Sequence, residues 1–512
     1  MRVLVPLALV LLVAAGFSGC FDSEDLDDDP ESGFAQGYPR YEPANDLYHY
    51  EFDVQGETFH FDFAPGAIGK AWNKGDQPLT IELPEKFLLI SGANGTSGSF
   101  SLAPASFDLA PGAKQFFLAP PATTTVQVTV DGDMVTLDPV GIKDYQESET
   151  QVVSGENVYA LSEHQEANFP HRTPGRPNYA ASQAYFAQSF RDLGYDVEVD
   201  PYGTTDLPTG CLPAGLEGQL CPSSVANIVA MKPGTEDPGK IIFVAGGHYD
   251  MVPGTTHAAF DDTSGVVTTM ELARALAPYD FRYTLAFALW GGEEDGILGS
   301  QFWVQTNPDA RARVLSYWNL DVVGMSWPAP LSPEIDPVVI SAGPDAPSGE
   351  GGGTSDPISQ DLLAWAQTLQ QDWFGFPEEV NGTDVFYYEG VAAGQAAGYA
   401  AVNAQSDHTP FMAAGIPAYF IFNGDALGEG GVGIHNERDT LVNLTKYSVY
   451  GTDTDFDADF ASIEDFELGR QALADSWETV MFFPLYHTLL TDLGVYTPPG
   501  VAGRSPASIP AL

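Results

Sequence analysis

Two histidines and several acidic residues follow an apolar stretch in the segment GGHYDMVPGTTHAAFDDTSGVV, residues 246–267. His248, Asp250 and Asp261 offer imidazole nitrogens and carboxylate oxygens, the donors with which proteins hold divalent transition metals. His257 lies in the loop-like GTTHAAF and is expected to be a surface or rim residue. These residues could also be ordinary polar residues at the end of a strand. A metal site here would therefore need further donors from elsewhere in the chain.

Further donors follow three other apolar runs that are expected to be strands. Glu293 and Glu294 follow RYTLAFALW, Asp321 follows VLSYWNL, and His435 follows AYFIF and a Gly-rich loop. In open α/β sheets, functional groups gather beyond the carboxyl ends of the strands. Chance could place one or two such groups at strand ends, but hardly five. The sequence therefore predicts that these side chains share one edge of a sheet.

The elements that must position these residues occupy residues 145–495. Near-continuous apolar runs such as KIIFVAGG alternate with helical patterns, among them PNYAASQAYFAQSFRDLG and the long DFELGRQALADSWETVMFFPLYHTLL. Buried strands that alternate with helices are typical of a mostly parallel sheet flanked by helices on both faces. We therefore predict an α/β domain over residues 145–495, followed by a flexible tail over residues 496–512.

Residues 42–144 have a different texture. Short apolar or alternating runs, such as YHYEFDV, TFHFDF, LTIEL and TVQVTV, are separated by Gly, Pro, Asn and Asp. This pattern predicts a β-rich accessory domain, a small sandwich or barrel. No metal or nucleophile pattern is recognisable in it, so a binding module and a spacer are both open.

The first 20 residues, MRVLVPLALVLLVAAGFSGC, predict a signal peptide and therefore export of the chain. The ending FSGC resembles a lipoprotein signal and predicts a lipid on Cys20, with ordinary secretion or an uncleaved anchor as alternatives. Residues 21–41 are acidic and weakly hydrophobic, which predicts a flexible tether. The lipid would be the only membrane attachment.

The other two cysteines, Cys211 and Cys221, lie in the loop-like GCLPAGLEGQLCP. In an exported chain they predict a disulfide, with two free thiols as the alternative.

The whole chain carries 70 acidic and 20 basic residues, a net charge of −50. This charge repels nucleic acid and anionic membrane surfaces, and it favours solubility and salt tolerance over an acidic funnel for cationic substrates.

Five motifs stand in a fixed order along the second half of the chain: GGHYD, FDDTSG, WGGEEDGILGS, NLDVVG and GIHNERDT. Together they resemble the co-catalytic zinc aminopeptidase family. That family includes secreted bacterial leucine aminopeptidases, glutamate carboxypeptidases, glutaminyl cyclases and the catalytically silent transferrin-receptor ectodomain. The resemblance covers roughly residues 150–490 and implies a phosphorylase/hydrolase-like zinc peptidase fold.

The resemblance implies two divalent metal ions in one site, with Zn²⁺ the expected metal. One ion would be held by His248 and Asp321, the other by Glu294 and His435, and Asp261 would bridge the two. Two cations so close together repel, so a shared carboxylate is physically needed. The oxygen-rich ligand set would also admit Co²⁺ or Mn²⁺. The family pattern further implies a cis peptide bond between Asp261 and Asp262.

Three residues are expected to assist. Glu293 would be the general base, because it neighbours a metal ligand but is free to face a water molecule. Asp250, two residues after His248 on the same side of an extended segment, would be the second catalytic residue by orienting that imidazole. His408 in QSDHTPFM is a candidate substrate or oxyanion contact, but a helix start capped by Ser406 or Asp407 fits this motif equally well.

These assignments predict a metal-dependent exopeptidase that removes N-terminal residues from peptides or small proteins. A carboxypeptidase or dipeptidase is the alternative; it needs a cationic anchor, for which Arg172, Arg176 and Arg438 are the candidates near the motifs. A catalytically silent, tethered binding protein would be a non-enzymatic alternative. A glutaminyl cyclase fits less well, because those relatives use a reduced metal set. The sequence does not predict residue preference or oligomeric state.

Overall fold

The computed structural model describes residues 46–54, 56–121, 126–137, 142–146, 152–202, 225–324, 338–341, 357–376, 379–380, 383–384, 386–389, 406–422 and 432–498. The predicted signal peptide, the tether, Cys20, Cys211, Cys221 and the tail from residue 499 lie outside these residues. Among the described helices, none combines the length and the apolar character needed to cross a membrane.

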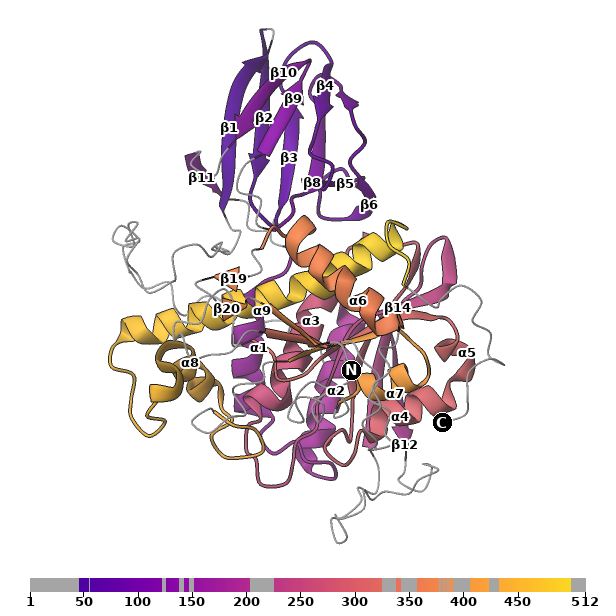
Figure 1. Ribbon diagram of the computed structural model, residues 1–512, viewed down its shortest axis with the longest axis vertical. Coiled ribbons are helices and arrows are strands. Elements are labelled where there is room, and N and C mark those ends of the chain that lie inside the picture. Colours follow the sequence, from indigo (N-terminus) through magenta and orange to yellow (C-terminus); the bar gives the residue numbers. More distant parts are fainter. Residues whose placement is uncertain are drawn as a thin grey trace, which may run out of the picture.

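Residues 46–146 form a β-module of two sheets (Figure 1). The larger sheet has the order β11-β1-β2-β3-β8-β5-β6, and β15 (Tyr279–Asp280) of the following domain extends it next to β6. The smaller sheet has the order β10-β9-β4-β7. Alternate residues of β2, Phe59, Phe61 and Phe63, are fully buried between the sheets, where they meet residues of β4, β8 and β9. The predicted sandwich thus follows from the period-two pattern of the sequence. The strands are β1 Asp46–Val54, β2 Glu57–Phe63, β3 Ile68–Asn73, β4 Leu79–Glu82, β5 Leu88–Ile90, β6 Gly98–Leu102, β7 Phe107–Leu109, β8 Lys114–Leu118, β9 Val126–Val130, β10 Asp133–Leu137 and β11 Ile142–Gln146.

The rest of the described chain is an α/β domain around an eight-stranded sheet with the order β12-β13-β16-β14-β17-β22-β18-β21. The four central strands, β16, β14, β17 and β22, run parallel. On one side β13 pairs antiparallel with β16, and on the other side β18 pairs antiparallel with β22. The bounds are β12 Asp196–Tyr202, β13 Val225–Lys232, β14 Asp237–His248, β16 Tyr283–Trp290, β17 Val314–Leu320, β18 Val338–Ser341, β21 Phe386–Glu389 and β22 Ala418–Phe422, with the short β19 Glu379–Val380 and β20 Thr383–Asp384 outside this sheet. The predicted mostly parallel sheet is therefore confirmed, with antiparallel strands added at its flanks.

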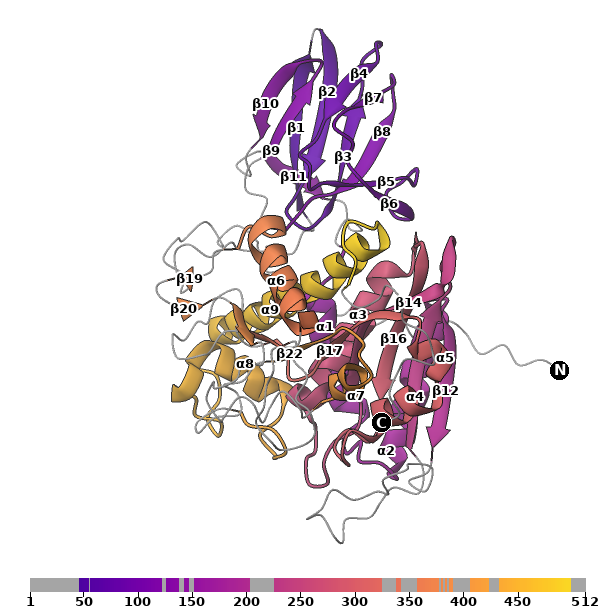
Figure 2. The ribbon, with the colours of Figure 1, turned by 45° about the vertical axis from the view of Figure 1, so that its right-hand side comes forward.

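Helices cover both faces of this sheet (Figure 2). Ile242 of β14 joins the core on the face covered by α1, α2, α3 and α9, whereas Phe243 joins the core on the face of α4 and α7. Successive residues of a strand point to opposite faces, so an uninterrupted apolar run is what a sheet covered on both sides requires. The helices are α1 Gly155–Asn168, α2 Pro177–Asp192, α3 Ser264–Leu276, α4 Leu298–Thr306, α5 Pro308–Arg311, α6 Pro357–Thr368, α7 His408–Ala413, α8 Leu441–Tyr450 and α9 Ile463–Asp492.

The β-module and the α/β domain share contacts along α9 and a short strand. β15 (Tyr279–Asp280) pairs with β6, and the Tyr279 ring lies 4.7 Å from the ring of Phe100. The hydroxyl of Tyr486 in α9 donates to the carbonyl of Ala119 at 3.0 Å. At Gly66 a Cβ atom would lie 2.7 Å from the Phe482 ring, so this hairpin packs on α9 only because the residue is Gly.

His487 lies in this packed region of α9 and gives a test of the core. Its ring is fully buried beside Trp318, Tyr419 and Tyr496, and neither ring nitrogen makes a hydrogen bond. Burial lowers the pKa of His487 to about 3, so only the unfolded chain takes up this proton between pH 6.5 and 3. The stability due to the neutral ring is complete above pH 6.5 and is lost as the pH falls.

We expect His487→Phe to flatten the pH dependence. Lowering the pH from 7 to 5 should destabilise the wild type by about 2 kcal/mol more than the variant. Urea titrations at both pH values, with chelator present and α9 packing followed by fluorescence, measure the difference. Equal losses in the two proteins would show that this ring does not stay neutral.

Candidate metal centre

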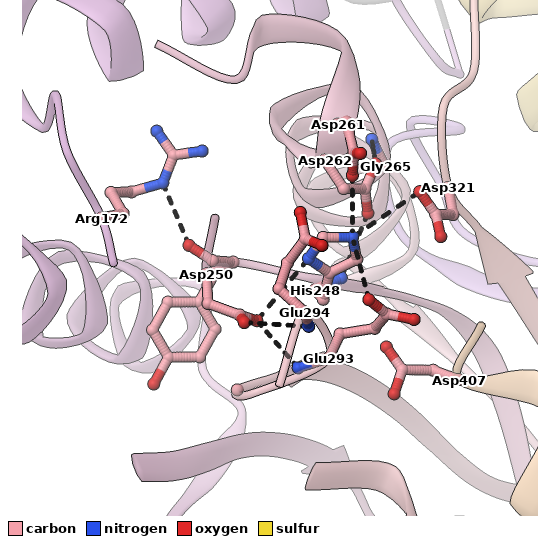
Figure 3. A network of polar contacts seen from close by, with 12 residues as sticks. Arg172, His248, Asp250, Asp261, Asp262, Gly265, Glu293, Glu294, Asp321 and Asp407 are labelled. Carbon is pink, nitrogen blue, oxygen red and sulfur yellow. Dashed lines mark hydrogen bonds and ion pairs between the residues drawn. The ribbon is translucent and has the colours of Figure 1, made fainter. Parts of the chain in front are cut away.

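The sheet brings the predicted donor residues to one place from separate points of the chain. Figure 3 shows His248, Asp261, Glu294 and Asp321 of this group, with Glu293 beside them. His248 is the last residue of β14, Asp321 directly follows β17, and Glu293 and Glu294 lie in the turn after β16. Asp261 lies in the irregular turn Ala259–Thr263 before α3, and His435 lies in the loop before α8. Because β14, β16 and β17 are parallel neighbours, their carboxyl ends meet at the same edge.

The donors form two groups that share Asp261. In the first group, Nε2 of His248 lies 3.1 Å from Asp261 Oδ1 and 3.7 Å from Asp321 Oδ1. In the second group, Nε2 of His435 lies 3.0 Å from Asp261 Oδ2 and 3.1 Å from Glu294 Oε2. Within each group the donor atoms lie within 4.8 Å of one another. Each oxygen of the Asp261 carboxylate therefore faces a different group.

The buried polar atoms of this cluster fit metal ions better than a metal-free hydrogen-bond network. Oδ1 of Asp321 and Oε1 of Glu294 are buried and make no hydrogen bond. A buried carboxylate oxygen without a donor is costly unless a cation compensates it. Two imidazoles and three carboxylates, divided into two groups around one shared residue, have the composition and arrangement suited to a pair of zinc-like ions.

The pKa shifts agree with a site of high negative charge. Hydrogen bonds from His435 to Asp261 and Glu294 raise the pKa of His435 to about 10. Although burial alone would raise it, hydrogen bonds from the two histidines lower the pKa of Asp261. Burial raises the pKa of Glu294 to about 7. Without a metal, protons on the histidines thus balance part of the carboxylate charge, and bound metal would replace them.

Residues 227–452, which contain every donor of this cluster, match Peptidase family M28. This segment, called the M28 segment below, is similar to Peptidase family M28. The match confirms the family resemblance drawn from the five sequence motifs.

Curated relatives and solved structures are similar to parts of this chain. A probable zinc metalloprotease of Pyrenophora tritici-repentis is 38% identical over 121 residues, which are 22% of this chain and 28% of the relative. Another, from Leptosphaeria maculans, is 31% identical over 217 residues, 38% of this chain and 46% of the relative. The chain thus matches less than half the length of these curated relatives.

Among solved structures, the glutaminyl cyclase of Porphyromonas gingivalis has a TM-score of 0.43 at 18% identity, covering 66% of this chain and 98% of that one. The aminopeptidase of Aneurinibacillus sp. strain AM-1 has a TM-score of 0.39 at 17% identity, covering 66% and 94%.

Asp250 of the M28 segment contacts both the histidine and the glutamate turn. Its Oδ1 lies 3.6 Å from Nδ1 of His248, longer than a direct hydrogen bond. Its two oxygens also accept from the backbone N–H groups of Glu293 and Glu294, each at 3.2 Å. Asp250 therefore fixes the turn after β16 at least as firmly as it orients His248, a role that the sequence did not suggest.

Two further buried aspartates hold the turn that carries Asp261. Asp439 accepts from the backbone N–H groups of Phe260 and Asp261 at 2.6 and 3.1 Å. Asp262, joined to Asp261 by a cis peptide bond, accepts from the N–H groups of His248 and Gly265 at 3.1 and 2.8 Å. A Cβ at Gly265 would lie 2.6 Å from the Asp262 carboxylate, so this approach requires Gly.

Asp321 ends a buried chain of hydrogen bonds. Nε1 of Trp290 donates to Tyr317 at 2.8 Å, and the Tyr317 hydroxyl donates to Oδ1 of Asn319 at 2.7 Å. Nδ2 of Asn319 then donates to Ser406, whose hydroxyl donates to Oδ2 of Asp321 at 2.6 Å. Oδ1 of Asp321 is thereby left toward His248. The sequence does not indicate this function of Ser406, because its partner Asp321 lies 85 residues away in the chain.

We expect Ser406→Ala to weaken metal binding about 10- to 100-fold, because partners that orient a ligand have effects of this size. Metal-dependent activity during titration with a zinc buffer measures the affinity. Ser316→Ala, on the strand that Asp321 directly follows, is the matched control, because the buried Ser316 hydroxyl has no hydrogen-bond partner. Equal zinc affinity in both variants would contradict the role of Ser406.

Glu293 faces the same cluster. Its Oε2 lies 4.0 Å from Nε2 of His248, and burial raises its pKa well above the usual range for Glu. Asp407, buried nearby and held by the Ser300 hydroxyl, contributes to the same rise. Glu293 is therefore next to the metal-type donors without belonging to either of their groups.

His408 was expected either to contact substrate or to lie at a helix start capped by Ser406 or Asp407, and the structure differs from both expectations in part. Its ring is fully buried and stacks on Phe420 with 4.5 Å between centroids, which is a packing contact. The alternative, a helix start capped by Ser406 or Asp407, also needs correction. The Asp407 side chain makes no capping hydrogen bond, because it accepts from Ser300, and Ser406 donates to Asp321.

Proposed function

We propose that the M28 segment is a zinc-dependent aminopeptidase with two metal ions bridged by Asp261. The observation that carries this proposal is the placement of the two Asp261 oxygens, 3.1 and 3.0 Å from Nε2 of His248 and of His435. One ion would be held by His248, Asp261 and Asp321, and the other by Asp261, Glu294 and His435. When bound, such a pair polarises a carbonyl and acidifies water.

Glu293 supplies the proton transfers in this proposal. Its carboxylate accepts a proton from the attacking water and delivers it to the nitrogen of the departing amine. A buried carboxyl with a raised pKa suits both steps, because it holds the transferred proton between them. The backbone N–H groups of Glu293 and Glu294, held by Asp250, fix the direction of the base and of the neighbouring ligand.

The charges around the site favour a substrate with a free ammonium group over one with a terminal carboxylate. Of the three arginines near the motifs, Arg172 is buried and donates to the carbonyl of Tyr249 at 3.0 Å and to Thr263 at 2.7 Å. The Arg438 guanidinium lies 5.3 Å from the Phe456 ring, and Arg176 is the N-cap residue of α2. Within the described residues, these candidates supply no buried anchor aimed at a carboxylate, whereas the acidic cluster attracts an amine.

A matched pair of peptides tests the proposed activity. We expect a peptide with a free N-terminus to be hydrolysed from that end. Its N-acetylated form should be hydrolysed at least about 100-fold more slowly, because acetylation removes the ammonium group that would pair with a buried carboxylate of the acidic cluster. Chelation should abolish turnover, and added Zn²⁺ should restore it. Equal cleavage of both peptides, or release from the C-terminus, would replace aminopeptidase by dipeptidase or carboxypeptidase activity. No turnover of either peptide would favour the silent binding protein.

Export, the lipid on Cys20 and the disulfide between Cys211 and Cys221 remain predictions of the sequence. They would place this peptidase outside the cytoplasm, as a lipoprotein or a secreted enzyme that acts on peptides or small proteins.

A further inference from the structure

A second group of metal-type donors lies in the β-module, on the side of the large sheet that faces away from the sandwich core. His49 and Glu51 belong to β1, and His60 belongs to the neighbouring strand β2. Their donor atoms lie within 4.8 Å of one another, the same limit that the two groups of the M28 segment satisfy. We propose that the β-module binds its own divalent transition-metal ion through His49, Glu51 and His60.

Strand pairing creates this group. β1 and β2 run antiparallel, with His49 opposite Asp62 and Glu51 opposite His60 (Figures 1 and 2 show the two strands side by side). Residues two apart on a strand share a face, so the four side chains form a square on one side of the sheet. The sequence alone shows no metal pattern here, because the HYE and HFD segments form a donor group only when this strand register brings them together.

Asp62 has the position of a partner that prepares a histidine for metal. Its Oδ1 forms a short hydrogen bond with Nδ1 of His49, which leaves Nε2 of His49 as the lone-pair nitrogen. Histidine ligands of metals generally donate their other N–H to a carboxylate in this way. The second oxygen of Asp62 lies 3.3 Å from the ammonium of Lys70, so the carboxylate charge is balanced locally.

His60 supplies the independent observation that points to a ligand. Its side chain is 94% buried, and Nε2 makes no hydrogen bond even though Oε2 of Glu51 lies 2.6 Å away. The Glu51 carboxylate is 60% exposed, so it can turn to share a metal ion with this nitrogen.

The ligand set indicates the class of metal. Two imidazoles and one carboxylate suit Zn²⁺, Cu²⁺, Ni²⁺ or Co²⁺, and they are too poor in oxygen for Ca²⁺ or Mg²⁺. The ion would join β1 to β2, and so it would stabilise this part of the module. This inference does not depend on the proposed peptidase activity.

Cobalt binding to the full chain tests the inference. We expect wild-type protein equilibrated with Co²⁺ to bind one more equivalent per chain than the His49→Gln/His60→Gln double variant, with the extra ion visible in the cobalt absorption spectrum. The double variant should keep its peptide hydrolysis, since neither residue belongs to the M28 segment. Asp261→Asn separates the two sites: this variant should lose cobalt from the M28 centre and keep the module ion.

Glu51→Gln keeps the test valid if the double variant fails to fold, because an exposed side chain tolerates this change. It should weaken the module site at least about tenfold, which a titration with competing chelator measures. Ca²⁺ should not compete with Co²⁺ for the site in the β-module. Equal cobalt content and equal affinity in the wild type and in a folded module variant would overturn the proposal and leave His49, Glu51 and His60 as an ion-pair network.

Discussion

Replacing Glu293 by Gln is expected to lower kcat for the free-N-terminus peptide by about 10²- to 10⁴-fold while metal content stays unchanged. General acid–base groups contribute rate factors of this size, and Gln preserves the shape of the side chain without accepting a proton. Oε2 of Glu293 lies 4.0 Å from Nε2 of His248, so the base stands beside the proposed metals without holding one. Steady-state kinetics and metal analysis of the same sample measure both quantities.

Asp295→Asn is the matched control for this experiment. Asp295 follows Glu293 and Glu294 in the same turn, undergoes the same change of charge, and belongs to neither donor group. Its activity should stay within about tenfold of the wild type, below the range expected for a proton-transferring group. A Glu293→Gln enzyme with near-normal kcat would show that the proton is transferred elsewhere.

Asp261→Asn is expected to remove both metals and with them all measurable turnover. Metal affinity should fall by more than about 100-fold, the upper value for the loss of a mere supporting partner. Asn has one carbonyl oxygen and no charge, so it cannot offer one oxygen to each of two ions. Its backbone N–H and that of Phe260 still reach Asp439, so the turn itself should keep its form.

The contrast with Ser406→Ala makes this result specific. Ser406 donates to one of the metal-type donors, Asp321, so its loss should weaken metal binding without abolishing it. If Asp261→Asn kept two metals, or lost one ion while the other stayed fully bound, the bridging role would be wrong.

Much of the fold and of the M28 donor set was accessible from the sequence. β14, β16 and β17 are long apolar runs because helices cover both faces of the sheet, and parallel strands must bring His248, Glu294 and Asp321 to one edge. The helix from Ile463 was also predictable, although its start is fixed by Ser462, which accepts from the N–H of Asp465.

Interactions that depend on register or on distant partners could not be predicted. Ser406 reaches Asp321 across 85 residues, and Asp250 turns toward the backbone of Glu293 and Glu294, which no local spacing reveals. The donor group of the β-module depends on β1 and β2 pairing His49 with Asp62; a shift by one residue would move the histidines to opposite faces.

Anomalous diffraction at the zinc absorption edge, from crystals of the zinc-loaded protein, would locate the metal ions relative to Asp261. A bridged centre gives two peaks, one on each side of the Asp261 carboxylate and about 3.5–4 Å apart, the spacing of two-metal hydrolytic sites. His248 and Asp321 would lie next to the first peak, and Glu294 and His435 would lie next to the second. A single peak, or two peaks that do not share Asp261, would contradict the bridged centre.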